Sequence, residues 1–168
     1  MKNLKFFTLA IAILGFTSVS FAQTPQVNAT SEAFATIIAP ITINNTAALR
    51  FGNIIASAEK GTVIVDTENN RKNEGGAYFP SIQGEVNSAE FKVTGLSGAA
   101  YSLTLPKSTN LKSDTGSEMK ITNFTANAKQ VLTDKGEEVF QLGATLNVEA
   151  NQLAGKYEGQ FEVTVNYN

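Results

Sequence analysis

The sequence predicts an all-β protein, an immunoglobulin-like antiparallel β-sandwich that forms a single domain after an N-terminal signal peptide. Two observations support this prediction. Short segments rich in β-branched and aromatic residues recur along the chain, separated by turns of Gly, Asn, Asp and Ser. No window of helical length shows an apolar stripe at three-and-four spacing, apart from an ambiguous stretch at residues 28–38. Regularly spaced short strands without helices are typical of sandwiches.

The N-terminus has the pattern of a signal peptide covering residues 1–22. Two basic residues, Lys2 and Lys5, precede an apolar run that ends at Phe21. The small residues of Ser20-Phe21-Ala22 stand at the two positions that a signal peptidase reads, which predicts cleavage between Ala22 and Gln23. The alternative is a membrane anchor, but a span needs about 20 apolar residues, which is longer than this run. We therefore expect an exported protein in the periplasm, at the cell surface or secreted, without integral membrane insertion.

The composition excludes several classes of chemistry. The chain has no cysteine and no histidine, so Ser-His-Asp and Cys-His nucleophilic sites are ruled out, as is ordinary zinc, haem or iron–sulfur ligation. The formal net charge is −2 and no basic patch is present, which argues against a nucleic-acid partner. We expect no enzymatic activity, no metal and no cofactor.

The first segment of the exported chain permits two interpretations. Residues 23–26 are expected to form a short linker to a domain at residues 27–168. The stretch from Asn28 to Ile38 is rich in alanine, which favours a helix. Its Thr and Ile content and the stop at Pro40 favour a strand instead. On an extended chain one face carries Ala29, Ser31, Ala33 and Ala35, and the other carries Phe34, Thr36 and Ile38.

The remaining strands are expected at regular intervals, with a polar Gly-rich loop at residues 69–76 and a polar excursion at residues 106–117. Ser97-Gly98 is expected to form a tight hairpin between its two flanking strands, because glycine tolerates positive φ. The predicted strands span residues 49–55, 61–67, 89–96, 99–105, 119–126, 139–150 and 160–167.

The last predicted strand has the clearest alternation. Phe161, Val163, Val165 and Tyr167 alternate with polar residues, which is the period-two pattern of a half-buried strand. An exposed strand edge can pair with another chain. We therefore take these four residues as a candidate interaction edge.

Short motifs recur in a fixed order: Leu49-Arg-Phe-Gly52, Gly61-Thr-Val-Ile-Val65, Phe91-Lys-Val-Thr-Gly95, Tyr101-Ser-Leu-Thr-Leu-Pro106, and Gly155-Lys-Tyr157 followed by the alternating run to Tyr167. Together they resemble the domain of unknown function 4402 family of exported bacterial proteins, from about Val27 to Asn168. The resemblance implies an immunoglobulin-like all-β domain with no settled activity. Phe51-Gly52 is expected to form a bend, and Tyr157 a corner residue whose hydroxyl caps a loop.

More distantly, the chain is similar to spore-coat-U-like and chaperone–usher pilin domains. Those domains also end in a Gly-x-Tyr turn and an alternating strand, and pilins complete their sandwich with a strand donated by a neighbour. Two features of this chain depart from the pilin pattern. It lacks the disulfide that many pilins carry, and residues 27–35 offer mostly Ala and Ser where a donor strand usually presents bulky hydrophobes.

Two further groups of residues are candidate sites. Tyr78 and Phe79 form an aromatic loop segment that is expected either to stack on a ligand such as a surface glycan or to pack inward. The paired carboxylates at residues 66 and 68, 114 and 118, and 137 and 138 are expected to be solvated loop charges. A glycosidase pair needs two carboxyls about 5–10 Å apart in a cleft, which sequence neighbours rarely achieve.

The leading hypothesis is a non-catalytic structural or interaction protein, such as a fimbria-like or cell-surface subunit, that associates by β-strand edge pairing. Its partners would be copies of itself or other envelope proteins, through residues 28–38 or through the last strand. The alternative is a glycan- or ligand-binding module that uses the loops around Tyr78 and residues 106–118.

Overall fold

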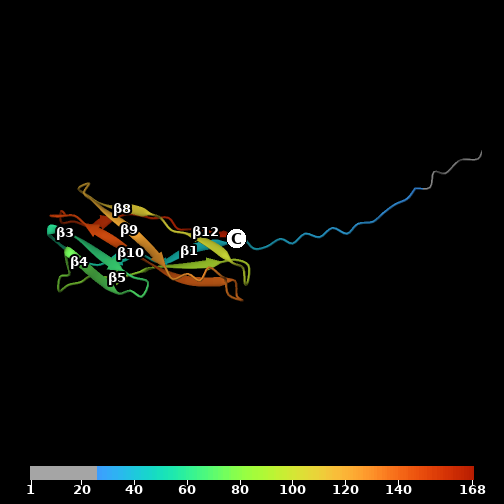
Figure 1. Ribbon diagram of the computed structural model, residues 1–168, viewed down its shortest axis with the longest axis horizontal. Helices are drawn as coiled ribbons and strands as arrows, with labels where there is room; N and C mark the ends of the chain where they lie inside the picture. Colours follow the sequence, from blue (N-terminus) through green and yellow to red (C-terminus); the bar gives the residue numbers. More distant parts are fainter. Residues whose placement is uncertain (1–25) are drawn as a thin grey trace, which may run out of the picture. The chain divides into compact units, whose positions relative to one another are not determined.

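The computed structural model describes residues 26–168, so the predicted signal peptide lies outside the described residues. The chain divides into two units after Thr36. Residues 26–36 carry no regular secondary structure, and residues 37–168 form one compact all-β unit (Figure 1). The described residues contain no helix, and therefore none with the length and hydropathy that a membrane crossing requires. The all-β, sandwich-like domain that the sequence predicts is confirmed.

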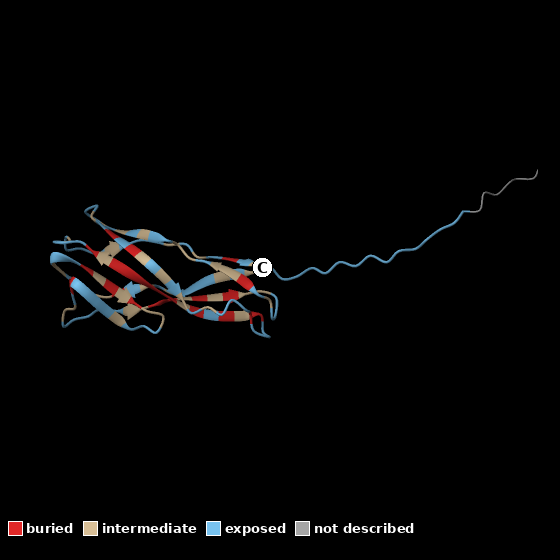
Figure 2. Cartoon of the chain, viewed as in Figure 1, coloured by how far each residue is buried: buried red, intermediate tan, exposed pale blue. Residues whose placement is uncertain are grey.

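The large sheet is built around one long strand, β10 (Glu137–Val148). One edge of β10 pairs with β9 (Glu118–Ala126). The other edge pairs with β6 (Ala89–Thr94) along its first half and with β3 (Ile55–Val65) along its second half. A single strand therefore joins two antiparallel regions of the sheet. It is buried over most of its length (Figure 2), and its side chains contribute to both buried clusters.

Shorter strands extend the large sheet beyond these neighbours. One strand adds to β6, one to β3 and two in series to β9, and every pairing is antiparallel. These are respectively β1 (Thr42–Ala47), β4 (Arg71–Tyr78), β8 (Ser108–Ser113) and β11 (Tyr157–Glu158).

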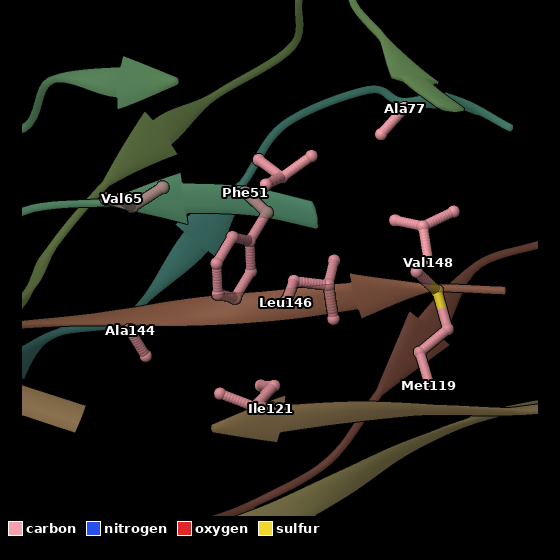
Figure 3. Close-up of a cluster of buried hydrophobic side chains, with 9 residues drawn as sticks. Phe51, Val65, Ala77, Met119, Ile121, Ala144, Leu146 and Val148 are labelled. Atoms are coloured by element: carbon pink, nitrogen blue, oxygen red, sulfur yellow. The ribbon is translucent and has the colours of Figure 1, made fainter. Parts of the chain in front are cut away.

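Two short strand pairs pack against the inner face of the large sheet. β2 (Arg50–Phe51) pairs with β5 (Val86–Asn87), and β7 (Tyr101–Thr104) pairs with β12 (Thr164–Tyr167). The buried side chains accordingly form two clusters. The first cluster joins β2 to the second half of β10, and the second joins β7 and β12 to the first half. Figure 3 shows the first cluster, in which Phe51 of β2 lies over Leu146.

The prediction of a strand at residues 28–38 is wrong for this structure. None of these residues is assigned to a strand, and all are exposed. No backbone–backbone hydrogen bond of the described chain involves them. A strand needs a partner backbone as well as an alternating pattern, and the pattern alone does not provide one.

Two segments that were predicted to be polar loops contain strands. Residues 69–76 mostly belong to β4, and the excursion at residues 106–117 contains β8. Each strand adds to a more apolar neighbour, and such outer strands tolerate charged side chains. The predicted hairpin at Ser97-Gly98 is also wrong. Gly98 does have positive φ, at 69°, but the strands on either side pair with other partners, in different sheets.

Candidate functional site

An open groove of about 930 Å³ lies on the inner face of the large sheet, beside the second half of β10. Its floor is apolar and consists of side chains of the first buried cluster and their neighbour on β8. Residues 48–56 line one side of the groove, and residues 152–161 line the other. We call these segments the first wall and the second wall. The floor consists of Leu111, Met119, Ile121, Leu146 and Val148, of which the last four appear side by side in Figure 3.

The first wall bends at the predicted position. Gly52 has φ of 70°, and a Cβ at this position would meet the Arg71 guanidinium and the Gln83 carbonyl. Arg71 Nη1 donates hydrogen bonds to the carbonyl oxygens of Phe51 at 2.8 Å and Asn53 at 3.3 Å. Phe51 itself is buried in the first cluster. The expected Phe51-Gly52 bend is therefore confirmed, and a guanidinium from β4 fixes its backbone.

Tyr157 fixes the second wall. Its hydroxyl donates to the carbonyl oxygen of Leu153 at 2.7 Å and accepts a hydrogen bond from Gln152 Nε2 at 2.9 Å. Gln152 Nε2 also reaches Ser117 Oγ at 3.0 Å. The predicted corner role of Tyr157 is confirmed, since its hydroxyl closes the loop at residues 152–157.

The second wall continues into a segment whose backbone has no ladder partner. β11 ends at Glu158 and β12 begins only at Thr164. Among the described residues, no backbone–backbone hydrogen bond outside the strands involves residues 159–163. Side chains hold this segment in place: Thr109 Oγ1 donates to the Gln160 carbonyl at 2.8 Å, and the Phe161 ring lies 5.1 Å from that of Phe124.

This gap corrects the bounds of the last predicted strand. The sequence predicts one strand over residues 160–167, but only residues 164–167 pair, with β7. Phe161 and Val163 still pack against the second cluster, as the alternation requires. The pattern of a strand is therefore present over residues 160–163, and the neighbouring strand is missing.

The rim of the groove carries two exposed ion pairs. Arg50 Nε lies 3.3 Å from a Glu85 carboxylate oxygen, and Lys156 Nζ lies 2.6 Å from one of Glu158. The hydrogen bond with Glu158 raises the pKa of Lys156. Each charge is balanced by its neighbour, and the floor offers only apolar side chains. The groove is therefore suited to an apolar or uncharged partner.

The side chains of the candidate interaction edge mainly stabilise their own domain. Val165 is buried, and Val163 and Tyr167 pack against the second cluster. The Tyr167 hydroxyl donates to the Ala39 carbonyl at 2.9 Å and accepts from the backbone N–H of Leu96 at 2.7 Å. Of the four predicted residues only Phe161 lines the groove.

The structure separates the two residues of the predicted ligand loop. Tyr78 is the last residue of β4 and is 51% exposed. Phe79 packs against the first cluster, and the Arg71 guanidinium lies 3.7 Å from its ring centre. Residues 106–118 belong to the opposite side of the sheet, beyond β9, whereas β4 lies beyond β3. The predicted loops are therefore not brought together, and Tyr78 and Phe79 lie outside the groove.

The paired carboxylates form no shared site. The Asp66 carboxylate accepts hydrogen bonds from its own turn, including one from the Asn70 side chain at 3.0 Å that lowers the pKa of Asp66. Glu137 pairs with Lys92 at 2.8 Å. Glu138, which was expected to be solvated, is instead buried. Over residues 26–168 no three His, Cys, Asp or Glu side chains are grouped so as to hold a metal ion.

A family model described as Domain of unknown function (DUF4402) matches residues 41–167. The chain belongs to this family. The DUF4402 match runs from the residue before β1 to the end of β12, so it contains both walls and the floor of the groove. Residues 26–40 precede the match. Searches of curated proteins and of solved structures found no match.

Proposed function

We propose that this protein is an exported, non-catalytic structural or interaction subunit, of a fimbria-like or cell-surface kind, that associates by β-strand pairing. Its partners are copies of itself or other envelope proteins. The observation that supports this proposal is the groove. It combines an apolar floor with residues 159–163, at the end of the second wall, which have the side-chain pattern of a strand but no ladder partner.

An added strand would satisfy both features of the groove. Its backbone would supply hydrogen bonds to the unpaired groups of residues 159–163, and its inward side chains would occupy the space of the groove. Strand addition of this kind derives affinity from main-chain bonds and specificity from alternate side chains. The sandwich is self-contained everywhere else along β10, which is covered by β7 and β12 at its first half.

The alternative of glycan binding receives less support from the structure. It requires an aromatic platform formed by Tyr78 and Phe79 with residues 106–118 nearby. Phe79 is covered by Arg71, and residues 106–118 lie across the sheet from Tyr78. We therefore base the proposal on the groove.

The test blocks the groove at its rim while leaving the core intact. Leu153 and Ala154 line the groove and are exposed, so the double variant Leu153→Lys, Ala154→Arg places two charges at the entrance without removing a buried side chain. Ile82→Lys is the matched control, because Ile82 is 79% exposed and lies outside the groove.

Sedimentation of residues 23–168 over a range of concentrations measures self-association. We expect the parent chain and the Ile82→Lys control to associate, and the groove double variant to dissociate to monomers. A double variant that associates as strongly as its parent would overturn the proposal, and a parent chain that stays monomeric throughout would rule out copies of itself as the partner.

A further inference from the structure

We propose that a polar crevice, at the point where the large sheet splits, binds one sugar residue through a pair of its hydroxyl groups. The crevice has a volume of about 240 Å³ and shares no lining residue with the groove. This inference is therefore independent of the proposed function and adds a second site to the domain. The lining residues of the crevice are Ala47, Asn69, Asn87, Ser88, Glu90 and Gln141.

The crevice lies where one edge of β10 changes its neighbour. β6 pairs with β10 as far as Ala89, which stands opposite Leu142, and β3 pairs from Val65, which stands opposite Ala144. The start of β6 and the end of β3 therefore meet end to end along this edge, and neither strand continues the ladder of the other. Backbone groups at such a break need partners outside the ladder, and here side chains supply them.

Asn69 bridges the break between the two strands. Its Oδ1 accepts hydrogen bonds from the backbone N–H of Ser88 at 2.6 Å and from the Ser88 hydroxyl at 3.0 Å. Asn69 has φ of 66°, a left-handed conformation that asparagine adopts more readily than most residues. The Asp66 carboxylate fixes this turn, since its Oδ1 accepts the backbone N–H groups of Glu68 at 2.8 Å and Asn70 at 2.9 Å. The bridging side chain thus stands on a turn that is already ordered.

A chain of hydrogen bonds fixes the opposite side of the crevice. Glu90 Oε1 accepts from Thr46 Oγ1 at 2.7 Å, and Glu90 Oε2 accepts from Gln141 Nε2 at 3.2 Å. A carboxylate can only accept, so Gln141 must turn Nε2 toward Glu90. Its Oε1 then accepts from Asn127 Nδ2 at 3.0 Å. The orientation of each of these groups is therefore determined by its neighbour.

The crevice keeps both donors and acceptors that the protein itself does not use. Within residues 26–168, Asn69 bonds through Oδ1 alone, so its Nδ2 retains two N–H donors. The Asn87 carboxamide makes no hydrogen bond in this part of the chain and is reached by solvent. The Glu90 carboxylate has about four acceptor positions, and two of them are occupied.

This mixture identifies the chemistry of the ligand. Acceptors alone would suit a cation, and donors alone would suit an anion. A hydroxyl group both donates and accepts, and neighbouring hydroxyls on a sugar ring present two such groups at a fixed spacing. The volume lies below the range of about 300–1,000 Å³ that drug-sized ligands occupy, which favours a single ring.

The site differs from the predicted ligand loop in place and in affinity. Tyr78 and Phe79 do not line the crevice, and none of its lining residues is aromatic. Aromatic rings contribute large buried areas to binding sites, so a site without them depends on hydrogen bonds. We therefore expect a Kd of about 1 mM for a single sugar.

Titration of ¹⁵N-labelled residues 23–168 with methyl hexosides, each added alone, tests the proposal. The side-chain amide signals of Asn69, Asn87 and Gln141 report on the crevice directly in NMR spectra. We expect at least one methyl hexoside to shift these signals in a saturable way. Asn87→Ala removes a carboxamide that holds no other part of the described chain, and it should weaken binding about tenfold.

Asn166→Ala is the matched control, because Asn166 is exposed and lies outside the crevice. It should bind the sugar like the parent chain. Binding that Asn87→Ala leaves unchanged would place the sugar elsewhere and overturn the proposal. The absence of a saturable shift with every methyl hexoside would overturn it too.

Calcium chloride, titrated in the same way, separates a sugar site from a cation site. Glu90→Gln keeps the size of the side chain and removes its charge. Shifts that appear with calcium chloride, disappear in Glu90→Gln and have no counterpart with any hexoside would make the crevice a cation site, and the sugar would be the wrong ligand. Every one of these outcomes leaves association through the groove untouched, so the proposed function depends on its own test.

Discussion

The hydroxyl of Tyr101 donates a 2.9 Å hydrogen bond to the carboxylate of Glu138, across the second buried cluster. The other carboxylate oxygen accepts the backbone N–H of Lys129. Tyr101 has no exposed surface and Glu138 is buried. A buried carboxylate is tolerated only when hydrogen bonds satisfy it. This pair therefore connects β7 of the inner layer to β10 of the large sheet.

Removing the hydroxyl should destabilise the domain. Tyr101→Phe keeps the ring in the core but leaves one oxygen of Glu138 without its donor. We expect a loss of about 1–3 kcal/mol in the free energy of unfolding, as for other unsatisfied buried groups. Urea unfolding of residues 23–168 measures it. Tyr78→Phe is the control, since its side chain is half exposed, and it should change stability by less than about 0.5 kcal/mol. Equal stability of the two variants would contradict this account.

The same pair should make the domain sensitive to alkaline pH. Burial, and then the hydrogen bond and charge of Glu138, raise the pKa of Tyr101 above its usual value. In the unfolded chain a tyrosine ionises near pH 10, so above that pH the unfolded state releases the proton first. The contribution is complete below about pH 10 and is lost as pH rises further. Unfolding free energies measured from pH 8 to 11 should fall more steeply for the parent than for Tyr101→Phe. Parallel curves would rule this out.

The Tyr157 hydroxyl should control the order of the second wall. Tyr157→Phe removes the bonds to the Leu153 carbonyl and to Gln152. We expect a loss of about 1–2 kcal/mol in stability, together with faster amide exchange in residues 152–157. Hydrogen exchange followed by mass spectrometry measures this local effect, and β10 provides the internal reference. Exchange that rises equally in β10 would indicate global destabilisation, and the wall would then have no separate dependence on the hydroxyl.

The central strands could be predicted because their side chains alone specify their environment. Leu142, Ala144, Leu146 and Val148 alternate along β10 and all four are buried, as predicted, although Gly143 and Thr145 of the face expected to be solvated are buried too. Outer strands carry a weaker signal. β4 begins Arg-Lys-Asn-Glu-Gly-Gly, a composition typical of loops, and it is a strand because β3 offers it an open ladder. The free edge of β3 decides this case, and the composition of β4 alone does not indicate it.

The candidate site was harder to predict than the fold. The sequence indicated two parts of its walls, the Phe51-Gly52 bend and the Tyr157 corner, because glycine and tyrosine have distinctive roles there. The groove between them depends on the distance between segments separated by about a hundred residues, which no local pattern encodes. The alternation over residues 160–163 was the available signal. It described a strand correctly in side-chain orientation, but could not reveal that the pairing backbone was missing.

Arg71 should be irreplaceable by lysine, because its role depends on the planar guanidinium. Nη1 donates to the carbonyl oxygen of Phe51 and Nη2 to Gln83 Oε1 at 3.2 Å, while the same group stacks on Phe79. A lysine ammonium keeps the charge but cannot make these contacts together.

We therefore expect Arg71→Lys to lose about 1–3 kcal/mol in stability, and to weaken self-association as well, since the first wall loses the group that fixes its backbone. Thermal unfolding and sedimentation of residues 23–168 measure the two effects. Lys72→Arg, at the next position of β4, is the matched control and should alter neither. If Arg71→Lys retained full stability, charge alone would account for the role of Arg71, and the wall would not depend on the geometry of its side chain.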